Sequence, residues 1–516
     1  MGKHKYSLGI ELGSTRIKAV IVDSNGNTVT SGIHDWENDL IDGFWTYDLK
    51  NVWSGIKLSI KDIDKKELLT SINAIGISAM MHGYLPFDKK DNLLVNFRTW
   101  RNANTDKATK ELSKKLQFNI PHRWSIAHIY QAILDNEKHV NDINYFTTLA
   151  GYVHWKLTGE KVIGIGDASG MFPINSNTLK YDEKKLEKTN SLLKEKHFAK
   201  NLKELLPKPL VAGEGAGRLT KEGARLLDPE GNIKSGILMA PPEGDAGTGM
   251  VATNSVKKNT GNVSVGTSVF AMIVLDKELN NFYPEIDMVT TPDGKAVAMV
   301  HVNNCTSDLN EWINLFSELF SEFDFKVSKD RIFEKTFNLA LKADNKNSGL
   351  LSYGYFSGEN ITGIEEGRPL FVRLPNSKFD LANFMASHLN SAFATLSIGM
   401  NILYRENVNI KMINAHGGVF KTEKVAQKFL AASIDAPIAV SKTASEGGAW
   451  GMAILANYAN NNYNMNLSEY LEMHVFKDRE VSIYTPNKKE VEDYKEYLKK
   501  YKNGLEIEKT AGKVFS

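Results

Sequence analysis

The sequence predicts an α/β protein built from two similar domains. The main observation is an internal repeat: residues Gly9–Val22 and Asn262–Val274 each read as a strand, a turn of one glycine and two hydroxyl residues, and a second strand. The turn glycines Gly13 and Gly266 lie 253 residues apart (266 − 13), about half of the 516-residue chain. This spacing indicates two related domains, because solenoid repeats recur about every 20–50 residues.

The elements around the repeat support this division. Ile72–Ala79 reads as a buried strand, and helical periodicity covers residues 105–116, 128–140 and 147–157. The last of these helices is expected to end at Thr158-Gly159, with the glycine as its C-cap. The turn signal Pro292-Asp293-Gly294 is expected to continue the second domain. We place the boundary in the polar stretch near residue 257, which gives domains 1–257 and 258–516. The Lys/Glu-rich tail beyond about residue 460 is expected to form a helix on the surface.

Composition excludes several classes of protein. Hydrophobic residues make up 42% and charged residues 24%, values typical of globular proteins. A net charge of +2 argues against a dedicated nucleic-acid or membrane-surface protein. The single cysteine, Cys305, excludes a disulfide framework and a cysteine-based zinc cluster. With neither a signal peptide nor a membrane-spanning run recognised, we expect a cytoplasmic protein, and its size favours an enzyme.

The two glycine turns suit phosphate. A tight turn of small residues, Gly13–Thr15 or Gly266–Ser268, exposes main-chain N–H groups, and its hydroxyls add donors. Lys18 could add a positive charge. Each turn alone is better explained as an ordinary hairpin turn, but its repetition favours phosphate binding. Glu11 precedes the first turn in an apolar strand, where it either binds magnesium or is a solvated residue at a strand end.

Two further segments carry candidate chemistry. Asp245 lies where a Pro/Gly-rich loop enters a helix, and it is either an N-cap or a reactive carboxylate, with Glu243 as the rival for any catalytic role. Gly417 and Gly418 follow a strand-like segment. A double glycine there permits close approach of the backbone to a nucleoside, although a plain strand-to-helix turn would look the same.

Taken together, these segments resemble the FGGY carbohydrate kinases, of the superfamily that includes actin, hexokinase and the heat-shock chaperone ATPases. The resemblance extends to about residue 457, and its motifs follow the family's order. The matching segments are the two phosphate motifs, Gly9–Asp23 and Gly261–Leu275; the catalytic segment, Pro242–Ala252; the adenosine motif, Ile413–Lys421; and two N-terminal stretches, Gly151–Gly159 and Gly166–Gly170.

The resemblance implies two actin/hexokinase-like (ribonuclease H-like) domains with a cleft between them. The N-terminal domain would bind the sugar and the C-terminal domain the nucleotide. Asp245 would be the catalytic base and would contact the sugar. ATP would be bound by residues of both glycine turns and of the adenosine motif, with Mg²⁺ near Glu11; these ATP-binding residues are Gly13, Ser14, Thr15, Lys18, Gly266, Thr267, Ser268, Gly417 and Gly418.

The substrate side departs from the family in places. The segment Met81-His82-Gly83 is similar to the Met-His-Gly segment of xylulokinases, which lines their sugar site. Asn102 stands where the family often has an aspartate, Glu11 replaces the aspartate of the first motif, and Asn360 replaces a usual arginine. For Met81, His82 and Asn102 we therefore expect substrate contacts. The alternative for His82 and Asn102 is a satisfied polar residue near the domain core.

The function expected from these features is ATP-dependent phosphorylation of a pentulose such as xylulose or ribulose. The alternatives are a gluconate, erythritol or glycerol kinase of the same family, or a nucleotide-binding regulator without turnover. Expected partners are the sugar and ATP, not nucleic acid or membrane. The sequence leaves the oligomeric state open, with a homodimer as one option.

Overall fold

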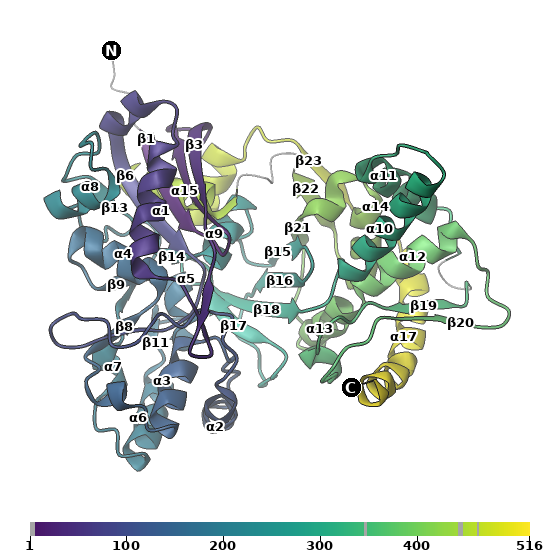
Figure 1. Cartoon of the computed structure of the whole chain (residues 1–516), viewed down its shortest axis with the longest axis horizontal. Helices are drawn as coiled ribbons and strands as arrows, with labels where there is room; N and C mark the ends of the chain where they lie inside the picture. The colour runs from purple at the N-terminus through teal and green to yellow at the C-terminus, as the bar shows by residue number, and fades with distance from the viewer. Residues whose placement is uncertain (1–5, 345–347, 442–446, 462–463, 516) are drawn as a thin grey trace. The chain divides into compact units, whose positions relative to one another are not determined.

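The computed structural model describes residues 6–344, 348–441, 447–461 and 464–515. The chain divides into two compact units, which Figure 1 shows with their elements labelled. Unit 1 is Met1–Lys258, Asn281–Val297 and Ser445–Arg479, and unit 2 is Asn259–Asn280, Ala298–Ala444 and Glu480–Ser516. The chain first leaves unit 1 beside the boundary expected near residue 257. The predicted halves differ from these units, however, because two later segments rejoin unit 1.

Unit 1 contains most of the short strands. Its strands are β1 (Tyr6–Leu12), β2 (Arg16–Val22), β3 (Thr28–Asp35), β4 (Asp39–Ile41), β5 (Phe44–Thr46), β6 (Ile72–Ala79), β7 (Leu85–Phe87), β8 (Tyr145–Thr147), β9 (Val162–Gly164), β10 (Ile174–Asn175), β11 (Lys180–Tyr181), β12 (Lys208–Leu210), β13 (Leu238–Met239), β14 (Glu243–Gly244) and β17 (Asp287–Thr290). Its helices are α1 (Leu49–Lys61), α2 (Asp106–Leu116), α3 (Ser125–Leu134), α4 (Leu149–Thr158), α5 (Ile165–Ala168), α6 (Glu183–Glu195), α7 (Leu202–Leu205), α8 (Lys221–Leu227), α9 (Asp245–Ala252), α15 (Gly447–Asn461) and α16 (Leu467–Tyr470).

The main sheet of unit 1 has the order β13-β6-β1-β2-β3, and β14 also pairs with β6. Strands β1, β2 and β3 are antiparallel, whereas β6 runs parallel to β1, β13 and β14. The predicted strand Ile72–Ala79 is β6. In this register Glu11 is opposite Ser78, and Ser78 is opposite Glu243. Two acidic residues therefore flank Ser78 in one row across the sheet.

Two glycines let helices approach the two faces of this sheet. A Cβ added at Gly9 would lie 2.1 Å from the carbonyl oxygen of Ala449 in α15, and one added at Gly32 would lie 2.0 Å from that of Ser59 in α1. Gly9 of β1 is opposite Val20 of β2, and Val20 is opposite Ser31 of β3. Gly9 therefore shares a face of the sheet with Ser31, which is one residue before Gly32. Because side chains alternate along a strand, α15 and α1 cover opposite faces.

The predicted helices of the first domain are present, with one shift. Residues 105–116 and 147–157 correspond to α2 and α4, and α4 ends at Gly159 in the left-handed conformation (φ 83°), as predicted for a C-cap. The helix expected over 128–140 is instead α3, which starts at Ser125 and ends at Leu134. Its early end has a local cause, since Asn136 adopts a left-handed φ of 55° that an α-helix cannot continue through.

The segment Asn281–Val297 belongs to unit 1. The prediction that the Pro292-Asp293-Gly294 turn continues the second domain is therefore wrong. Hydrogen bonds to α5 explain the placement: the Thr290 N–H donates to the Ser169 hydroxyl (3.0 Å), and the Thr290 hydroxyl donates to the carbonyl of Ile165 (3.0 Å). Such partners are distant in sequence, so turn chemistry alone could not reveal them.

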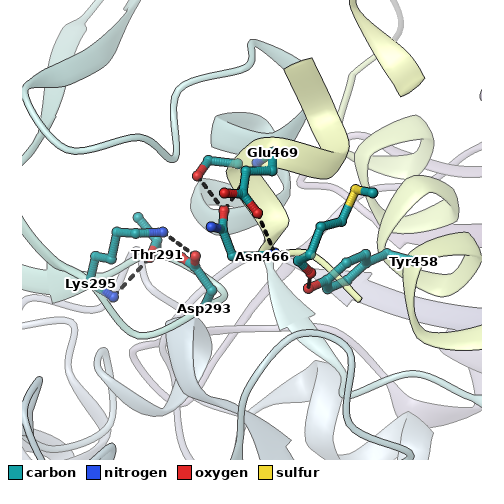
Figure 2. Close-up of polar contacts among 8 residues, drawn as sticks. Thr291, Asp293, Lys295, Tyr458, Asn466 and Glu469 are labelled. Carbon is teal, nitrogen blue, oxygen red and sulfur yellow. Dashed lines mark hydrogen bonds and ion pairs between the residues drawn. The ribbon is translucent and has the colours of Figure 1, made fainter. Parts of the chain in front are cut away.

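Local polar contacts shape both segments that rejoin unit 1, as Figure 2 shows. In the first segment, the Thr291 hydroxyl donates to Asp293, and both the main-chain N–H and the ammonium group of Lys295 close the turn onto Thr291 and Asp293. In the second, Asn466 and Glu469 form a reciprocal capping box that begins α16. These contacts fix local shape without reference to the rest of the chain.

Unit 2 repeats the strand order of unit 1. Its strands are β15 (Thr260–Val265), β16 (Val269–Val274), β18 (Ala296–Val302), β19 (Leu350–Tyr353), β20 (Leu370–Arg373), β21 (Met412–His416), β22 (Ile438–Ser441) and β23 (Val481–Tyr484). Its helices are α10 (Ser307–Glu322), α11 (Lys329–Ala340), α12 (Leu381–Ala392), α13 (Ala394–Arg405), α14 (Val425–Ile434) and α17 (Lys488–Val514). The path β18-β16-β15-β21-β22 matches β3-β2-β1-β6-β13, and β23 extends it. As in unit 1, the hairpin is antiparallel and the next two strands run parallel to its first strand.

The C-terminal tail is more than a surface helix, so that prediction is wrong in part. Tyr494, Tyr497 and Tyr501 form one buried stripe along α17 and pack in a core cluster with Tyr353, whose hydroxyl donates to the Tyr501 carbonyl (3.0 Å). Spacings of three and four residues put these tyrosines on one helix face. The Lys and Glu residues that dominate the composition hide this stripe. Neither α17 nor any other described helix is both long and apolar enough to cross a membrane.

Candidate active site

The turn Gly13–Thr15 joins β1 to β2 and is closed by a hydrogen bond from the Gly13 N–H to the Arg16 carbonyl (2.9 Å). All three carbonyl oxygens of the turn accept further hydrogen bonds of 2.6–3.1 Å, from the indole and main-chain N–H groups of Trp36 and from the Tyr47 hydroxyl. With its carbonyls occupied by protein donors, the turn offers a ligand mainly N–H groups and hydroxyls. That combination suits an anion.

The turn Gly266–Ser268 of unit 2 is built in the same way. The Gly266 N–H donates to the Ser268 carbonyl (2.8 Å). The Thr306 hydroxyl donates to the Gly266 carbonyl (2.7 Å), and the Cys305 N–H donates to the Thr267 carbonyl (2.8 Å). The closing hydrogen bond spans three residues in the first turn and two in the second, but both turns have carbonyls captured by protein donors, and each by itself presents donors to a ligand.

Glu11 occupies the end of β1 in a partly buried position. Its Oε2 accepts the Ala449 N–H (3.1 Å), and its Oε1 is so close to Gly448 that a Cβ there would lie 2.2 Å away. Burial, and secondarily the charge of Asp245, raises the pKa of Glu11 to about 7. Lys18, opposite Glu11 in the hairpin, acts against this rise. The glutamate is thus packed against α15 and is not freely solvated.

Asp245 is the first residue of α9, and the N-cap is Gly244. The N-cap interpretation of Asp245 is therefore wrong. Its Oδ1 accepts the main-chain N–H of Met81 (3.0 Å), which follows β6. Burial raises the pKa of Asp245, while the Met81 N–H and N–H groups at the start of α9 act in the opposite direction. A partly buried carboxylate is thus held between a helix start and the end of a parallel strand.

Glu243, the rival of Asp245, has a different environment. It is 1% exposed, and its two carboxyl oxygens accept the N–H groups of Gly166 (3.2 Å) and Asp167 (2.9 Å). Burial, together with the charge of Asp167, raises the pKa of Glu243 to about 8. Main-chain donors enclose the carboxyl of Glu243. Asp245 is therefore the better placed of the two to reach a substrate.

His82 lies next to Met81 in the same loop. It is buried and adopts a left-handed φ of 73°, which is uncommon for any residue other than glycine. Its Nδ1 is 3.2 Å from the carbonyl oxygen of Gly170, and its ring stacks on Trp124 with the centroids 6.3 Å apart. Unusual backbone conformations held by their surroundings occur frequently at functional sites.

Asn102 is almost fully engaged inside unit 1. Its side-chain oxygen accepts the Trp45 N–H (2.8 Å), and its side-chain nitrogen donates to the carbonyls of Trp45 (2.9 Å) and Thr99 (3.1 Å). The amide therefore pairs with Trp45 as a neighbouring strand would. This matches the alternative of a satisfied polar residue, and contact of Asn102 with the substrate stays a prediction.

In unit 2 the two adjacent glycines have different environments. Gly417 has a φ of 131°, and a Cβ added to it would lie 2.0 Å from the carbonyl oxygen of Val265. A Cβ added to Gly418 would meet nothing within 4 Å. Gly417 is therefore required for close packing on β15, whereas Gly418 borders open space where a ligand could approach the backbone.

Comparison with known families decides the class. The N-terminal domain of the FGGY family of carbohydrate kinases matches residues 6–231, and its C-terminal domain matches residues 261–460. The chain belongs to this family. It is thus an ATP-dependent carbohydrate kinase, which transfers phosphate to an alcohol group of a sugar.

Relatives of this FGGY kinase act on several substrates. The xylulose kinase of Haemophilus influenzae is 23% identical over 96% of this chain and 98% of its own length, and the glycerol kinase of Aquifex aeolicus is 27% identical over 38% of this chain and 41% of its own length. A gluconate kinase structure from Lactobacillus acidophilus has a TM-score of 0.79 at 20% identity, covering 99% of this chain and 100% of that one. Plasmodium falciparum glycerol kinase with ADP has a TM-score of 0.76 at 16% identity, over 97% and 98%. These structures confirm the predicted fold class of two similar actin/hexokinase-like domains.

The predicted metal ligand is Glu11. Among the described residues, no group of three or more His, Cys, Asp or Glu side chains is arranged to hold one. Glu11 fits a magnesium ion that has phosphate and water as its other ligands, because magnesium commonly takes one or two carboxylates in phosphate sites. A nearby cation would also favour the ionised form of this partly buried carboxylate.

Sequence reasoning gave no role to two residues of the site. Asp167 is completely buried beside Glu243, and Thr248 of α9 lies with its hydroxyl 3.1 Å from that of Ser78 in β6. An aspartate within the small-residue segment Gly166–Gly170 was the available signal for Asp167. Nothing in the sequence distinguishes Thr248 from an ordinary helix residue.

Proposed function

We propose that this FGGY kinase transfers the γ-phosphate of ATP to a hydroxyl group of a pentulose such as xylulose or ribulose. The observation that carries the proposal is the hydrogen bond between Asp245 at the start of α9 and the N–H of Met81. It joins the expected catalytic residue to the Met81-His82-Gly83 segment, which resembles the sugar-site segment of xylulokinases. Gluconate, erythritol and glycerol are the alternative substrates.

Asp245 acts as the general base. The Met81 N–H fixes one carboxylate oxygen, and the remaining lone pairs can accept the sugar hydroxyl, aim its oxygen and take its proton. The raised pKa of Asp245 makes it a stronger base than an ordinary aspartate. Phosphoryl transfer depends mostly on positioning and charge stabilisation, so a carboxylate of modest basicity is sufficient.

The two glycine turns bind the phosphates of ATP. Each has its carbonyls held by protein donors, which supports a role for its N–H groups and hydroxyls in anion binding. Lys18 adds positive charge near the first turn. Gly417 and Gly418 bring backbone close to the nucleoside, and the open space at Gly418 supports this assignment.

Glu11 holds Mg²⁺, directly or through water. When bound, this ion would neutralise charge on the transferred phosphate. The chain itself contributes a carboxylate fixed by the Ala449 N–H. Glu11 thus supplies negative charge for the ion, while Asp245 is kept for the sugar hydroxyl.

The sugar contacts Met81, His82 and Asp245, and Asn102 completes the pocket from the neighbouring loop. In this scheme the N-terminal domain, residues 1–257, binds the sugar and the C-terminal domain, residues 258–516, binds the nucleotide.

ADP release measured with a panel of acceptors tests the proposal. The panel contains D-xylulose, D-ribulose, L-ribulose, gluconate, erythritol and glycerol, and ³¹P NMR of the product identifies the hydroxyl phosphorylated. We expect the highest kcat/KM with a pentulose. A clear preference for another acceptor would replace the substrate, and nucleotide binding without turnover of any acceptor would favour a regulator.

A further inference from the structure

Glu243 is enclosed by the segment that contains α5. Its oxygens accept the N–H groups of Gly166 and Asp167, and a Cβ added at Gly164 or Gly166 would lie 2.3 Å or 2.5 Å from one of them. A Cβ added at Gly247 of α9 would also approach within 3.3 Å. Glycines thus make the space that this carboxyl fills. A substrate hydroxyl has no route to it in this conformation.

Asp167 is a second carboxyl group in the same place. It is completely buried, and its Oδ2 accepts the Thr148 hydroxyl (2.6 Å). Its Oδ1 is buried and meets no hydrogen-bond partner of good geometry in the part of the chain that the structure describes, although the nearby main-chain N–H of His82 opposes the rise of the Asp167 pKa. The Asp167 N–H donates to Glu243, so the two carboxyl groups are linked through one residue. Buried polar atoms without a partner are rare and call for an explanation.

Charged groups on the elements packed against α5 and β14 are engaged with other groups or exposed to solvent. Asp287, just before Thr290 in β17, pairs with Arg123. Lys161, just before β9, pairs with Asp91. Lys156 of α4 lies over the Trp155 ring at 3.8 Å, and Lys208 of β12 is exposed to solvent. The titratable groups near the two carboxyls include the Tyr181 hydroxyl, the carboxylate of Asp245 and His82, whose main-chain N–H opposes the rise of the Asp167 pKa. None of these lysines and arginines supplies a compensating positive charge.

Glu243 and Asp167 are both buried and interact electrostatically, so the two carboxyl groups cannot both ionise without a large cost. Burial comes first among the causes that raise both pKa values, and each gains a further rise from a neighbouring carboxylate. The pKa of Asp167 is raised to about 7 and that of Glu243 to about 8. At neutral pH the pair therefore retains a proton.

We infer that Glu243 and Asp167 share a proton beneath the loop that carries Asp245, and that Glu243 acts as a positioning residue for Asp245. This rests on the proposed role of Asp245 as the base. Only Gly244 separates Glu243 from Asp245, and both Glu243 and Gly244 pair with β6.

The same segment also reaches the other side of Asp245. The Gly170 carbonyl contacts the His82 ring, and His82 follows Met81, which donates to Asp245. The segment Gly164–Gly170 therefore holds the strand before Asp245 and the loop that fixes its carboxylate. A proton on the carboxyl pair also removes a negative charge that would repel the incoming phosphate.

The shared proton is tested by the pH dependence of unfolding, which needs no activity. A carboxyl with a raised pKa in the folded state binds more protons folded than unfolded, so its contribution to stability is lost as pH rises from about 4.5 to about 8. We expect the free energy of unfolding to fall less over this range in the double variant Glu243→Gln/Asp167→Asn. In Asp167→Asn alone, Glu243 loses the like charge of Asp167, so the pKa of Glu243 should be lower. The fall in the free energy of unfolding should then end at a lower pH. If the free energy of unfolding of the double variant falls with pH as steeply as that of the wild type, the inference of a shared proton is wrong.

The positioning role is tested by kinetics. In Glu243→Gln the amide nitrogen must face a main-chain N–H group, so the support of Asp245 is disturbed. We expect kcat to fall about 100-fold, as for small misplacements of reacting groups, with little change in KM for ATP or sugar. Glu406→Gln is the matched control, since Glu406 is 5% exposed and accepts the Asn280 N–H (2.9 Å) in unit 2. It should change stability but not kcat.

The outcomes separate this inference from the proposed function. Wild-type kcat in Glu243→Gln would overturn the positioning role while leaving Asp245 as the base. A loss in Glu243→Gln together with near-normal turnover in Asp245→Asn would make Glu243 the base and overturn both. If the wild-type protein phosphorylates no sugar, the proposed function fails, and the unfolding experiment still decides whether the pair shares a proton.

Discussion

The two hairpins of the molecule follow a similar course but differ in turn length and in chemistry, since four residues separate the paired Leu12 and Ile17 and three separate Val265 and Val269. In unit 1, Glu11 stands two residues before the turn glycine and Lys18 five residues after it. In unit 2 the residue two before the turn glycine is Ser264, and the residue opposite it in the hairpin is Phe270. Both turns have their carbonyls captured by neighbouring donors, and both first strands continue into a parallel partner. The repeated feature is thus the donor-rich turn, and the charged residues belong to unit 1 alone.

This difference indicates how two units with the same strand order can take different chemical roles. The strand order places a turn at the end of the first strand in each unit, whatever the side chains are. Charge then depends on single positions, because one residue at the strand end decides whether a carboxylate lies beside the turn. Besides Glu11, unit 1 brings Asp245, Asp167 and Glu243 to this edge of its sheet. Substitution of carboxylates in unit 1 should therefore impair the chemical step. In unit 2, the largest effects should come from substitutions that alter the backbone conformation or its packing.

The largest effect is expected from Asp245→Asn. Asparagine keeps the shape and loses the basicity, so kcat for sugar phosphorylation should fall by about 10²- to 10⁴-fold while ATP binding persists. Turnover is measured by ADP release and nucleotide binding by calorimetry. Asp106→Asn is the control, because Asp106 is also the first residue of a helix but is exposed. Near-normal turnover of Asp245→Asn would move the base elsewhere, first to Glu243.

In unit 2 the adjacent glycines should separate folding from binding. Gly417→Ala puts a Cβ against the Val265 carbonyl at a φ of 131°, so it should lower the free energy of unfolding by about 3 kcal/mol or more. Gly418→Ala meets no atom within 4 Å and should leave stability within about 1 kcal/mol of wild type while weakening nucleotide binding. Chemical denaturation and a nucleotide titration measure the two effects. Equal stability of the two variants would contradict the packing role of Gly417.

Glu11→Gln tests the charge difference between the hairpins directly. It keeps shape but removes charge, so the magnesium concentration giving half-maximal ADP production should rise about tenfold. Sugar binding without nucleotide should not change. The matched variant in unit 2, Ser264→Ala, should leave the magnesium midpoint where it is. An unchanged midpoint with normal turnover in Glu11→Gln would show that this glutamate holds no metal.

The smallest effect concerns an isolated buried carboxyl in unit 2. Glu508 is completely buried and accepts the Arg368 N–H (2.6 Å), and burial raises its pKa to about 7. A raised pKa means that its contribution to stability is lost as pH rises from about 4.5 to about 7. Glu508→Gln should therefore flatten this fall, by on the order of 1 kcal/mol, without altering kcat. An unchanged pH dependence of unfolding would show that Glu508 is ionised in the folded protein.

Local patterns in the sequence determined much of the fold. The two hairpins, the strand Ile72–Ala79 and the C-cap at Gly159 all depend on neighbouring residues, through turn chemistry and periodicity. The ordered motifs also determined the family, because each needs its glycines and acids at fixed spacing. Asp245 could be singled out in the same way, as an acid between a Pro/Gly-rich loop and a helix.

The tertiary structure decided what depends on partners far apart in the chain. Segment Asn281–Val297 rejoins unit 1 through Thr290, and α17 buries a tyrosine stripe that its charged residues conceal. The separate environments of Glu243 and Asp245 follow from contacts with residues about 80 and 160 positions away. A sequence records that two carboxylates lie two residues apart. Which of them is enclosed and which faces a ligand depends on burial and hydrogen bonding, and these arise only when distant segments pack together.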